Sequence, residues 1–268
     1  MPIGDFYATI SEKLLGKFVY RLFGTMDLHT HIRLRAMISF LKDYFNQCSI
    51  ENVEILELGC GNGINAFEIH KITSKEKINF NYIGVDLASK AIETANEFLR
   101  AMPDMRGEVS FYQEEAISFL EKEPSLKFDV ILLIDIIEHV KDSKKLLSLC
   151  KKHLKRGGLF IISVPTPLYP KFFGRKFHAQ VGHIVDGYSL SQIDEYLQSF
   201  NCQRMIYKYN TGLFSNLGCW LYYNKLNFSN NRYFRFLKAV LLYPFKFLDF
   251  INNQRLSCSL FVVYKNEK

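Results

Sequence analysis

The chain has 268 residues, 48% hydrophobic and 23% charged, with a net charge of +7; this composition is typical of a globular protein and excludes wholesale disorder. No apolar run reaches the roughly 20 residues needed to cross a bilayer. The start of the chain lacks a secretory layout, and the six scattered cysteines include no Cys-x-x-Cys pair, which predicts a cytoplasmic protein with reduced thiols.

Residues 5–45 have apolar side chains at helical spacing, which predicts two helices. We therefore expect residues 1–50 to form an N-terminal helical cap. Further along, apolar runs alternate with helical patterns. The predicted strands are residues 53–58, 80–85, 108–112, 128–134, 158–164, 203–208 and 257–264. The predicted helices are residues 64–73, 88–101, 114–121, 143–154 and 189–199. This alternation predicts an α/β fold with a doubly wound, mainly parallel seven-stranded sheet and a ligand crevice at the carboxyl ends of the strands.

The predicted core, residues 51–211 completed by a last strand in residues 253–268, is interrupted by a segment of different composition. Residues 212–252 contain 12 aromatic, five basic and one acidic side chain. On a helical projection of residues 232–250, the basic side chains share one face and the rest is almost wholly apolar. Such a helix suits either an anionic membrane surface or a lobe packed over the crevice, and both interpretations stay open.

The most informative stretch follows the first predicted strand and reads Glu57-Leu58-Gly59-Cys60-Gly61-Asn62-Gly63. Glycine has no Cβ, so a bulky ligand can lie directly on the backbone of this loop. The second predicted strand ends at Asp86, where a carboxylate can hold the hydroxyls of a ribose. An aspartate there can also cap the helix that follows, which is the structural alternative.

A third polar position follows the next predicted strand, at Glu114 and Glu115. A carboxylate there can accept a hydrogen bond from the exocyclic amine of an adenine, and Glu115 is the favoured residue. The alternative is that both side chains belong to the first turn of a helix, where negative charge is favourable.

Together with residues 128–140, these positions occur in a fixed order. The chain resembles the class I S-adenosylmethionine-dependent methyltransferases over about residues 51–208. The motifs that carry this resemblance are, in order, E-x-G-x-G-x-G, G-V-D, an acidic loop and F-D-V-I-x-x-x-D-x-I-E-H-V. The E-H-V loop is most similar to the small-molecule branch, which includes quinone and sugar methyltransferases. A dinucleotide site is disfavoured because its fingerprint is G-x-G-x-x-G.

The resemblance implies S-adenosylmethionine as the cofactor and a role for each matching residue. Glu57 is expected near the amino end of the methionine part, and Asp135 beside the methyl-donor pocket. The other implied cofactor contacts are Gly59, Cys60, Gly61 and Gly63 in the loop, Asp86 and Leu87 at the ribose, and Glu115 and Ala116 at the adenine.

Methyl transfer to a hydroxyl needs a base, and a neutral histidine suits that task. The candidates are His139 and His183, although the first can simply brace its loop and the second can hydrogen-bond backbone. Some of the quinone methyltransferases bind a divalent ion at this loop, which would involve Asp135, Glu138 and His139. Structural packing of Glu138 and His139 is favoured, so no metal is expected.

The sequence therefore predicts a methyltransferase that O-methylates a small or lipid-linked acceptor. A sugar hydroxyl in cell-surface glycan assembly is favoured, a quinone or isoprenoid is the main alternative, and a non-catalytic partner protein of the same fold is another. Nucleic acid is disfavoured, since the Asp135 loop lacks the N/D-P-P-[YF] pattern of amino-directed enzymes. Peripheral contact of residues 212–252 with the inner face of a membrane and the oligomeric state are left open.

Overall fold

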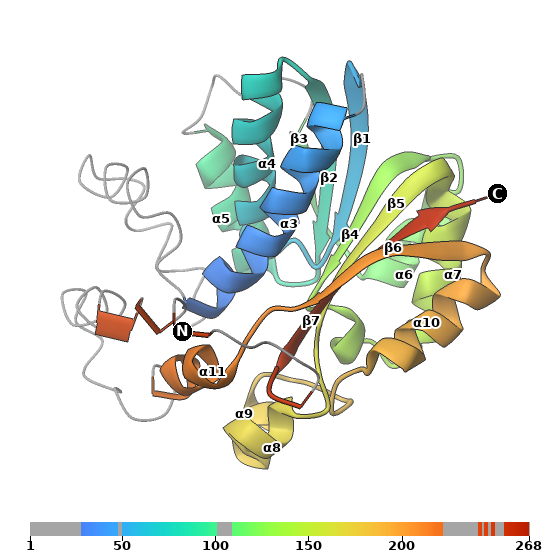
Figure 1. Cartoon of the computed structure of the whole chain (residues 1–268). Helices are drawn as coiled ribbons and strands as arrows, with labels where there is room; N and C mark the ends of the chain where they lie inside the picture. Colours follow the sequence, from blue (N-terminus) through green and yellow to red (C-terminus); the bar gives the residue numbers. More distant parts are fainter. Residues whose placement is uncertain are drawn as a thin grey trace.

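The computed structural model describes residues 28–47, 50–100, 109–221, 241–242, 244–245, 248–249 and 255–267. These residues contain a seven-stranded sheet of order β3-β2-β1-β4-β5-β7-β6 (Figure 1). The strands are β1 (Asn52–Leu58), β2 (Asn79–Asp86), β3 (Val109–Gln113), β4 (Phe128–Ile134), β5 (Leu154–Pro165), β6 (Cys202–Tyr209) and β7 (Ser259–Asn266). Neighbouring strands are parallel except that β7 runs antiparallel to β5 and β6. The doubly wound, mainly parallel sheet predicted from the sequence is confirmed.

Helices cover both faces of the sheet (Figure 1). One face carries α3 (Leu28–Gln47), α4 (Ile64–Glu76) and α5 (Ser89–Arg100), and the other carries α6 (Ala116–Lys122), α7 (Ser143–His153) and α10 (Leu190–Ser199). The sequence did not predict the 3-10 helix η1 (Ile137–His139) or the short helices α8 (Tyr169–Phe173) and α9 (Arg175–Gln180). A third short helix, α11 (Leu213–Trp220), begins the segment 212–252, which the sequence predicted as a helical insertion. These last three helices lie at the carboxyl ends of the parallel strands, where the ligand crevice is expected.

The alternation of side chains along the central strands divides the core into two halves. Leu56 of β1 and Ile131 of β4 pack with side chains of α6, α7 and α10, whereas Ile55 and Val130 pack with those of α3 and α4. All four side chains are completely buried. The central strands are therefore apolar on both faces, and each such side chain contributes on the order of 1.5–3 kcal/mol by its burial.

Two predicted helices lie mostly or wholly outside the described residues. The first half of the predicted N-terminal cap falls there, and α3 is the part of that cap which the structure describes. The amphipathic helix predicted at 232–250 is described only at residues 241–242, 244–245 and 248–249. Of the helices that are described, none combines the length and apolarity needed to cross a membrane.

Candidate functional site

The glycine loop turns the chain from β1 into α4 with a backbone that favours glycine. Gly59, Gly61 and Gly63 have φ angles of +74°, +54° and +74°. A Cβ at Gly63 would lie 2.6 Å from the ring of Phe111, so that position has no room for a side chain. The Gly59 amide donates to the Val85 carbonyl at 2.7 Å, which holds the loop against the end of β2.

Asp86 joins this loop to the segment that begins α5. Its Oδ2 accepts a hydrogen bond from the Gly61 amide and its Oδ1 accepts one from the Ala88 amide, both at 2.8 Å. Asp86 does not cap α5 itself, the alternative weighed from the sequence, because α5 begins at Ser89 and the Oδ1 atom of Asp86 accepts from the Ala88 amide before the helix. Each carboxylate oxygen can accept a further hydrogen bond, so the predicted ribose contact is compatible with this geometry and stays a prediction.

Glu57 lies behind the loop rather than on its surface. Its side chain is buried, and its carboxylate accepts hydrogen bonds from Asn65 Nδ2 and from the Tyr82 hydroxyl. Burial raises the pKa of this carboxyl to about 7. The two hydrogen bonds act in the opposite direction but are the smaller effect. Glu57 thus ties the loop to α4 and β2, and it does not line the cleft described next, although the sequence predicted a direct cofactor contact.

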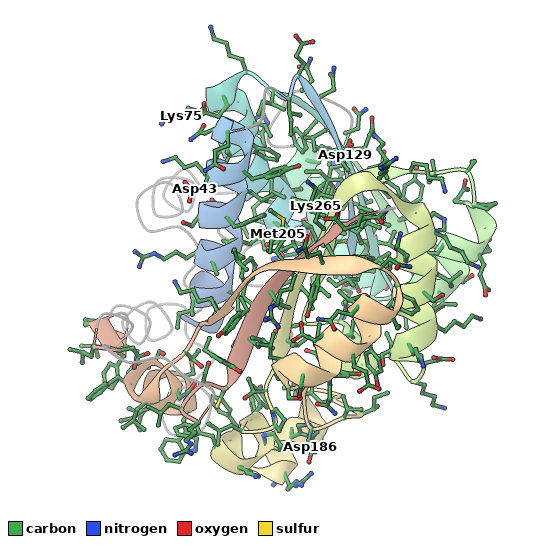
Figure 2. All side chains as sticks on the ribbon, turned by 45° about the vertical axis from the view of Figure 1, so that its right-hand side comes forward. Asp43, Lys75, Asp129, Asp186, Met205 and Lys265 are labelled. Atoms are coloured by element: carbon green, nitrogen blue, oxygen red, sulfur yellow. The ribbon has the colours of Figure 1, made fainter. Side chains whose placement is uncertain are left out.

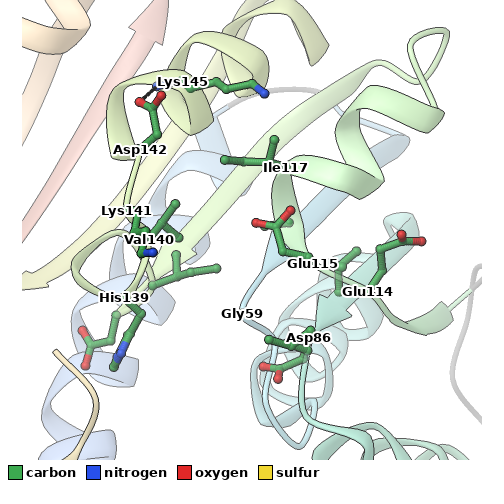
Figure 3. A pocket seen from close by; sticks show the side chains of 15 residues that line it. Gly59, Asp86, Glu114, Glu115, Ile117, His139, Val140, Lys141, Asp142 and Lys145 are labelled. Carbon is green, nitrogen blue, oxygen red and sulfur yellow. Dashed lines mark hydrogen bonds between the residues drawn. The ribbon is translucent and has the colours of Figure 1, made fainter. Parts of the chain in front are cut away.

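A cleft of about 690 Å³ opens at the carboxyl ends of the strands. Figure 3 shows its two walls, with Gly59, Asp86 and Glu115 on one side and His139 and Asp142 on the other. The lining residues are Gly59, Val85, Asp86, Leu87, Glu114, Glu115, Ala116, Ile117, Asp135, Ile136, His139, Val140, Lys141, Asp142 and Lys145. They include the predicted residues Gly59, Asp86, Leu87, Glu115, Ala116, Asp135 and His139. The predicted residues Cys60, Gly61 and Gly63 belong to the same loop as Gly59 without lining the cleft.

Several apolar lining residues were missed by sequence reasoning. Ile117, Ile136 and Val140 give the cleft an apolar surface suited to a flat ring, together with the exposed Leu87. In the sequence these residues look like ordinary core positions, because their periodicity does not distinguish a side chain that faces a ligand from one that faces protein.

Glu114 and Glu115 have different partners in the structure. Glu114 forms a salt bridge with Lys122 and accepts a hydrogen bond from the Ser118 hydroxyl at 2.8 Å. Glu115 caps α6 by accepting from the Ser118 amide at 2.8 Å with one oxygen. The alternative weighed from the sequence, a place at the start of a helix, is therefore present for Glu115, and its contact with an adenine amine stays a prediction.

Asp135 directly follows β4 and has an unusual backbone conformation, with a φ angle of +51°. Its amide donates to the Ser163 carbonyl at 2.8 Å, and its carboxylate forms an ion pair with Arg33 of α3. A helix that precedes the sheet therefore places a cation in the site. Sequence reasoning missed Arg33 because nothing around it in the helical pattern marks it as functional.

His139 and His183 are far apart in sequence but in contact in the fold, with ring centroids 4.8 Å apart. Nδ1 of His139 lies 3.0 Å from the Gly182 carbonyl, which can only accept, so in the neutral imidazole this nitrogen carries the proton and Nε2 has the lone pair. His183 does not line the cleft and packs between His139, Tyr169 and His178. Burial, followed by the neighbouring imidazoles and Arg33, lowers the pKa of His183 to about 4, which makes it a weak base.

Glu138 lies beside the two histidines and is completely buried. Burial raises its pKa to about 8, and its Oε1 lies 3.9 Å from Nε2 of His183. Glu138, His139 and His183 offer ligand atoms within 4.8 Å of one another, so they could hold a metal ion. The set considered from the sequence needs correction, because Asp135 is paired with Arg33 and His183 stands in its place.

A family model described as a methyltransferase domain matches residues 50–201. The chain belongs to this methyltransferase family. A ubiquinone biosynthesis O-methyltransferase of Rickettsia akari is 28% identical over 141 residues, which cover 53% of this chain and 51% of that protein. The protein of the same name from Albidiferax ferrireducens is 30% identical over 139 residues, which cover 51% and 52% of the two chains. This methyltransferase-family chain thus spans about half the length of the curated relatives it matches.

Solved methyltransferases share its fold. The SAM dependent methyltransferase from Archaeoglobus fulgidus superposes with a TM-score of 0.56 at 19% identity, over 95% of this chain and 100% of that one. Magnesium protoporphyrin IX methyltransferase from Synechocystis, solved with bound S-adenosylhomocysteine, has a TM-score of 0.56 at 11% identity, over 98% and 93%. The class I methyltransferase fold and family predicted from the sequence are confirmed.

Proposed function

We propose that this protein is an S-adenosylmethionine-dependent methyltransferase which O-methylates an aromatic, quinol-type acceptor with an apolar tail. The cleft carries the proposal, because the glycine loop, Asp86 and Glu115 follow one another along one wall in the order that methionine, ribose and adenine require. The names of the relatives, O-methyltransferases of ubiquinone biosynthesis, support the same reaction.

The acceptor class differs from the one that the sequence favoured. The relatives support the quinone alternative over a sugar hydroxyl, and the side chains next to His183 are aromatic. The rings of Tyr169 and Phe173 lie 4.7 Å apart, and that of Phe177 lies 6.0 Å from Phe173. Tyr169 and Phe173 are buried in a hydrophobic cluster, so the protein behind His183 is apolar. An apolar wall supports an aromatic acceptor, whereas a sugar needs several polar partners.

The acceptor hydroxyl has to lose its proton during the transfer. His139 is the favoured base, since it lines the cleft and its Nε2 has a lone pair. His183 is the weaker candidate, because its lowered pKa reduces its basicity.

An assay with radiolabelled S-adenosylmethionine tests the acceptor. We expect methylation of an ortho-dihydroxy aromatic compound with a short isoprenoid tail, and none of a lipid-linked sugar. Calorimetry with S-adenosylhomocysteine tests the cofactor independently. Binding without turnover on either acceptor would favour the non-catalytic alternative, and no binding would refute the cofactor assignment.

We also propose peripheral contact with an anionic membrane, which would supply an acceptor with an apolar tail. Leu213, Phe214 and Leu217 are exposed on α11, and Leu241 and Leu248 are exposed further along. Residues 212–252 also carry five basic side chains against one acidic side chain. Exposed apolar side chains in a segment of basic composition support contact with an anionic bilayer.

Co-sedimentation with vesicles tests this contact. We expect binding to vesicles that contain phosphatidylglycerol and much weaker binding to pure phosphatidylcholine. The triple variant Leu213→Ser/Phe214→Ser/Leu217→Ser should bind less, whereas Met205→Ser on the edge strand β6 is a control on another exposed apolar residue (Figure 2). Equal binding to both vesicles, or by the triple variant and wild type, would refute the contact.

A further inference from the structure

We propose that Tyr188 is a positioning residue for the methyl transfer, because its hydroxyl fixes the wall of the cleft that carries His139. Tyr188 lies two residues before α10, and its side chain is 5% exposed and packs in the core between the sheet and α7. It does not line the cleft, so it acts through the residues that do. The inference deepens the proposed function and rests on it for the measurement of turnover.

The connection between β4 and α7, residues 135–142, forms one wall of the cleft (Figure 3). Its lining residues are Asp135, Ile136, His139, Val140, Lys141 and Asp142. The local structure within it is a single 3-10 turn, in which the His139 amide donates to the Ile136 carbonyl at 2.9 Å and the Val140 amide to the Ile137 carbonyl at 3.4 Å. Such turns have poorer hydrogen-bond geometry than α-helices, so the position of this wall depends on contacts from elsewhere in the fold.

The Tyr188 hydroxyl contacts both ends of this connection. It donates to the carbonyl of Ile137, where η1 begins, at 3.3 Å, and it forms a hydrogen bond with Oγ of Ser143, where α7 begins, at 3.0 Å. Burial raises the pKa of Tyr188, so the hydroxyl keeps its proton for these bonds. One side chain thus joins the two ends of the loop that carries His139.

Tyr188 is itself fixed against the end of β5. Its amide donates to the Pro165 carbonyl at 2.8 Å. The preceding Gly187 has a φ angle of +118°, and a Cβ there would lie 2.5 Å from the same carbonyl oxygen, so the chain runs against β5 with no space for a side chain. The following Ser189 caps α10 in a capping box with Gln192. An inner strand and the start of a helix therefore hold the backbone on the two sides of Tyr188.

The segment that ends at Tyr188 also contacts the connection through its backbone. The Ile184 amide donates to the Glu138 carbonyl, and Nδ1 of His139 donates to the Gly182 carbonyl, both at 3.0 Å. Residues 182–188 therefore hold the backbone of η1 and the His139 ring together. The place of the proposed base is thus set from a segment about fifty residues later in the chain, and Tyr188 is the side chain that fastens this segment to the wall.

Turnover of Tyr188→Phe tests the proposal, since phenylalanine keeps the buried ring and removes only the hydroxyl. The acceptor is the ortho-dihydroxy aromatic compound with a short isoprenoid tail. A base displaced by about 1 Å can lose on the order of a hundredfold in rate, so kcat should fall by about 10–100-fold. The affinity for S-adenosylhomocysteine should change much less, because Gly59, Asp86 and Glu115 lie on the opposite wall. Tyr196→Phe, also on α10, is the matched control and should turn over as wild type does.

Ser143→Ala provides a second variant and carries the test if Tyr188→Phe does not fold. It removes one partner of the Tyr188 hydroxyl at a helical position that alanine favours, and kcat should fall in the same direction but less. The double variant should be no slower than Tyr188→Phe, because the contact between the two hydroxyls is already lost there. Losses that add up in the double variant would contradict a shared role.

Hydrogen exchange of residues 135–143, measured without acceptor, separates this inference from the proposed function. We expect faster exchange in Tyr188→Phe and wild-type exchange in Tyr196→Phe. Three results would overturn the positioning role: unchanged exchange in Tyr188→Phe, unchanged kcat, or a loss of S-adenosylhomocysteine affinity as large as the loss in kcat. If the wild type does not turn over, the acceptor assignment is refuted, and the exchange result alone decides whether Tyr188 holds the wall.

Discussion

Arg33 of α3 forms an ion pair with Asp135, the residue that follows β4 at the cleft. The two side chains are only 15% and 22% exposed, and Asp135 is held in a backbone conformation that non-glycine residues rarely adopt. A helix outside the sheet therefore helps to position the end of its central strand.

A double-mutant cycle measures this relationship. Arg33→Met leaves a partly buried carboxylate without its cation, and we expect the free energy of unfolding to fall by about 1–3 kcal/mol, less than for a fully buried pair. Asp135→Asn in the same protein should recover part of that loss. Urea denaturation of the wild type, both single variants and the double variant gives the coupling energy, and strictly additive changes would contradict the pair.

Asp86 should control cofactor affinity. Hydrogen bonds to charged groups contribute about 1.5–3 kcal/mol, so Asp86→Ala should weaken S-adenosylhomocysteine binding by about tenfold or more. The Gly61 amide also loses its acceptor in this variant, which loosens the loop. Calorimetry gives the affinity, with Asp43→Ala on the outer surface of α3 as the control (Figure 2). Unchanged affinity in Asp86→Ala would refute the ribose role.

Two glycines of the loop should respond differently to alanine. A Cβ at Gly63 would lie 2.6 Å from the Phe111 ring, whereas a Cβ at Gly61 would meet nothing within 4 Å. Both have positive φ angles, so each alanine introduces backbone strain of about 1–2 kcal/mol. Gly63→Ala adds a steric clash, and its melting temperature should fall well below that of Gly61→Ala. Equal melting temperatures would show that the Phe111 ring yields freely.

Glu57 should make stability depend on pH. Its pKa is about 7 in the folded protein against an ordinary 4.5, so between these pH values the folded state keeps a proton that the unfolded state has lost. The contribution of Glu57 to stability is therefore present at low pH, declines as pH rises from about 4.5 to 7, and is constant above that range. Glu57→Gln does not titrate and should lack this decline.

Urea denaturation of both proteins at several pH values provides the measurement. At about 1.4 kcal/mol per pKa unit, the difference in unfolding free energy between wild type and Glu57→Gln should change by about 3 kcal/mol across the window. Glu138 titrates in both proteins and cancels in this difference. A difference that does not vary with pH would show that the Glu57 carboxyl has an ordinary pKa.

Much of the fold could be predicted from the sequence because its determinants are local. The apolar runs that became β1, β2 and β4 are covered on both faces, and their periodicity identifies them without knowledge of their partners. The glycine loop and Asp86 were also visible, since positive φ angles and strand-end carboxylates act within a few residues along the chain.

The pairing of distant residues could be decided only by the tertiary structure. Asp135, Glu138 and His139 are neighbours in sequence and were considered as one set, yet Asp135 faces Arg33 from a helix about one hundred residues earlier, and His183 arrives from a later segment. Glu57 is a second example, since the sequence does not show that its carboxyl accepts hydrogen bonds from Asn65 and Tyr82; its predicted cofactor contact stays a prediction. Periodicity records which side of an element is buried, but packing between elements decides which groups meet. The sequence by itself therefore determined the sheet and the glycine loop, and the fold decided which charges and imidazoles meet beside the cleft.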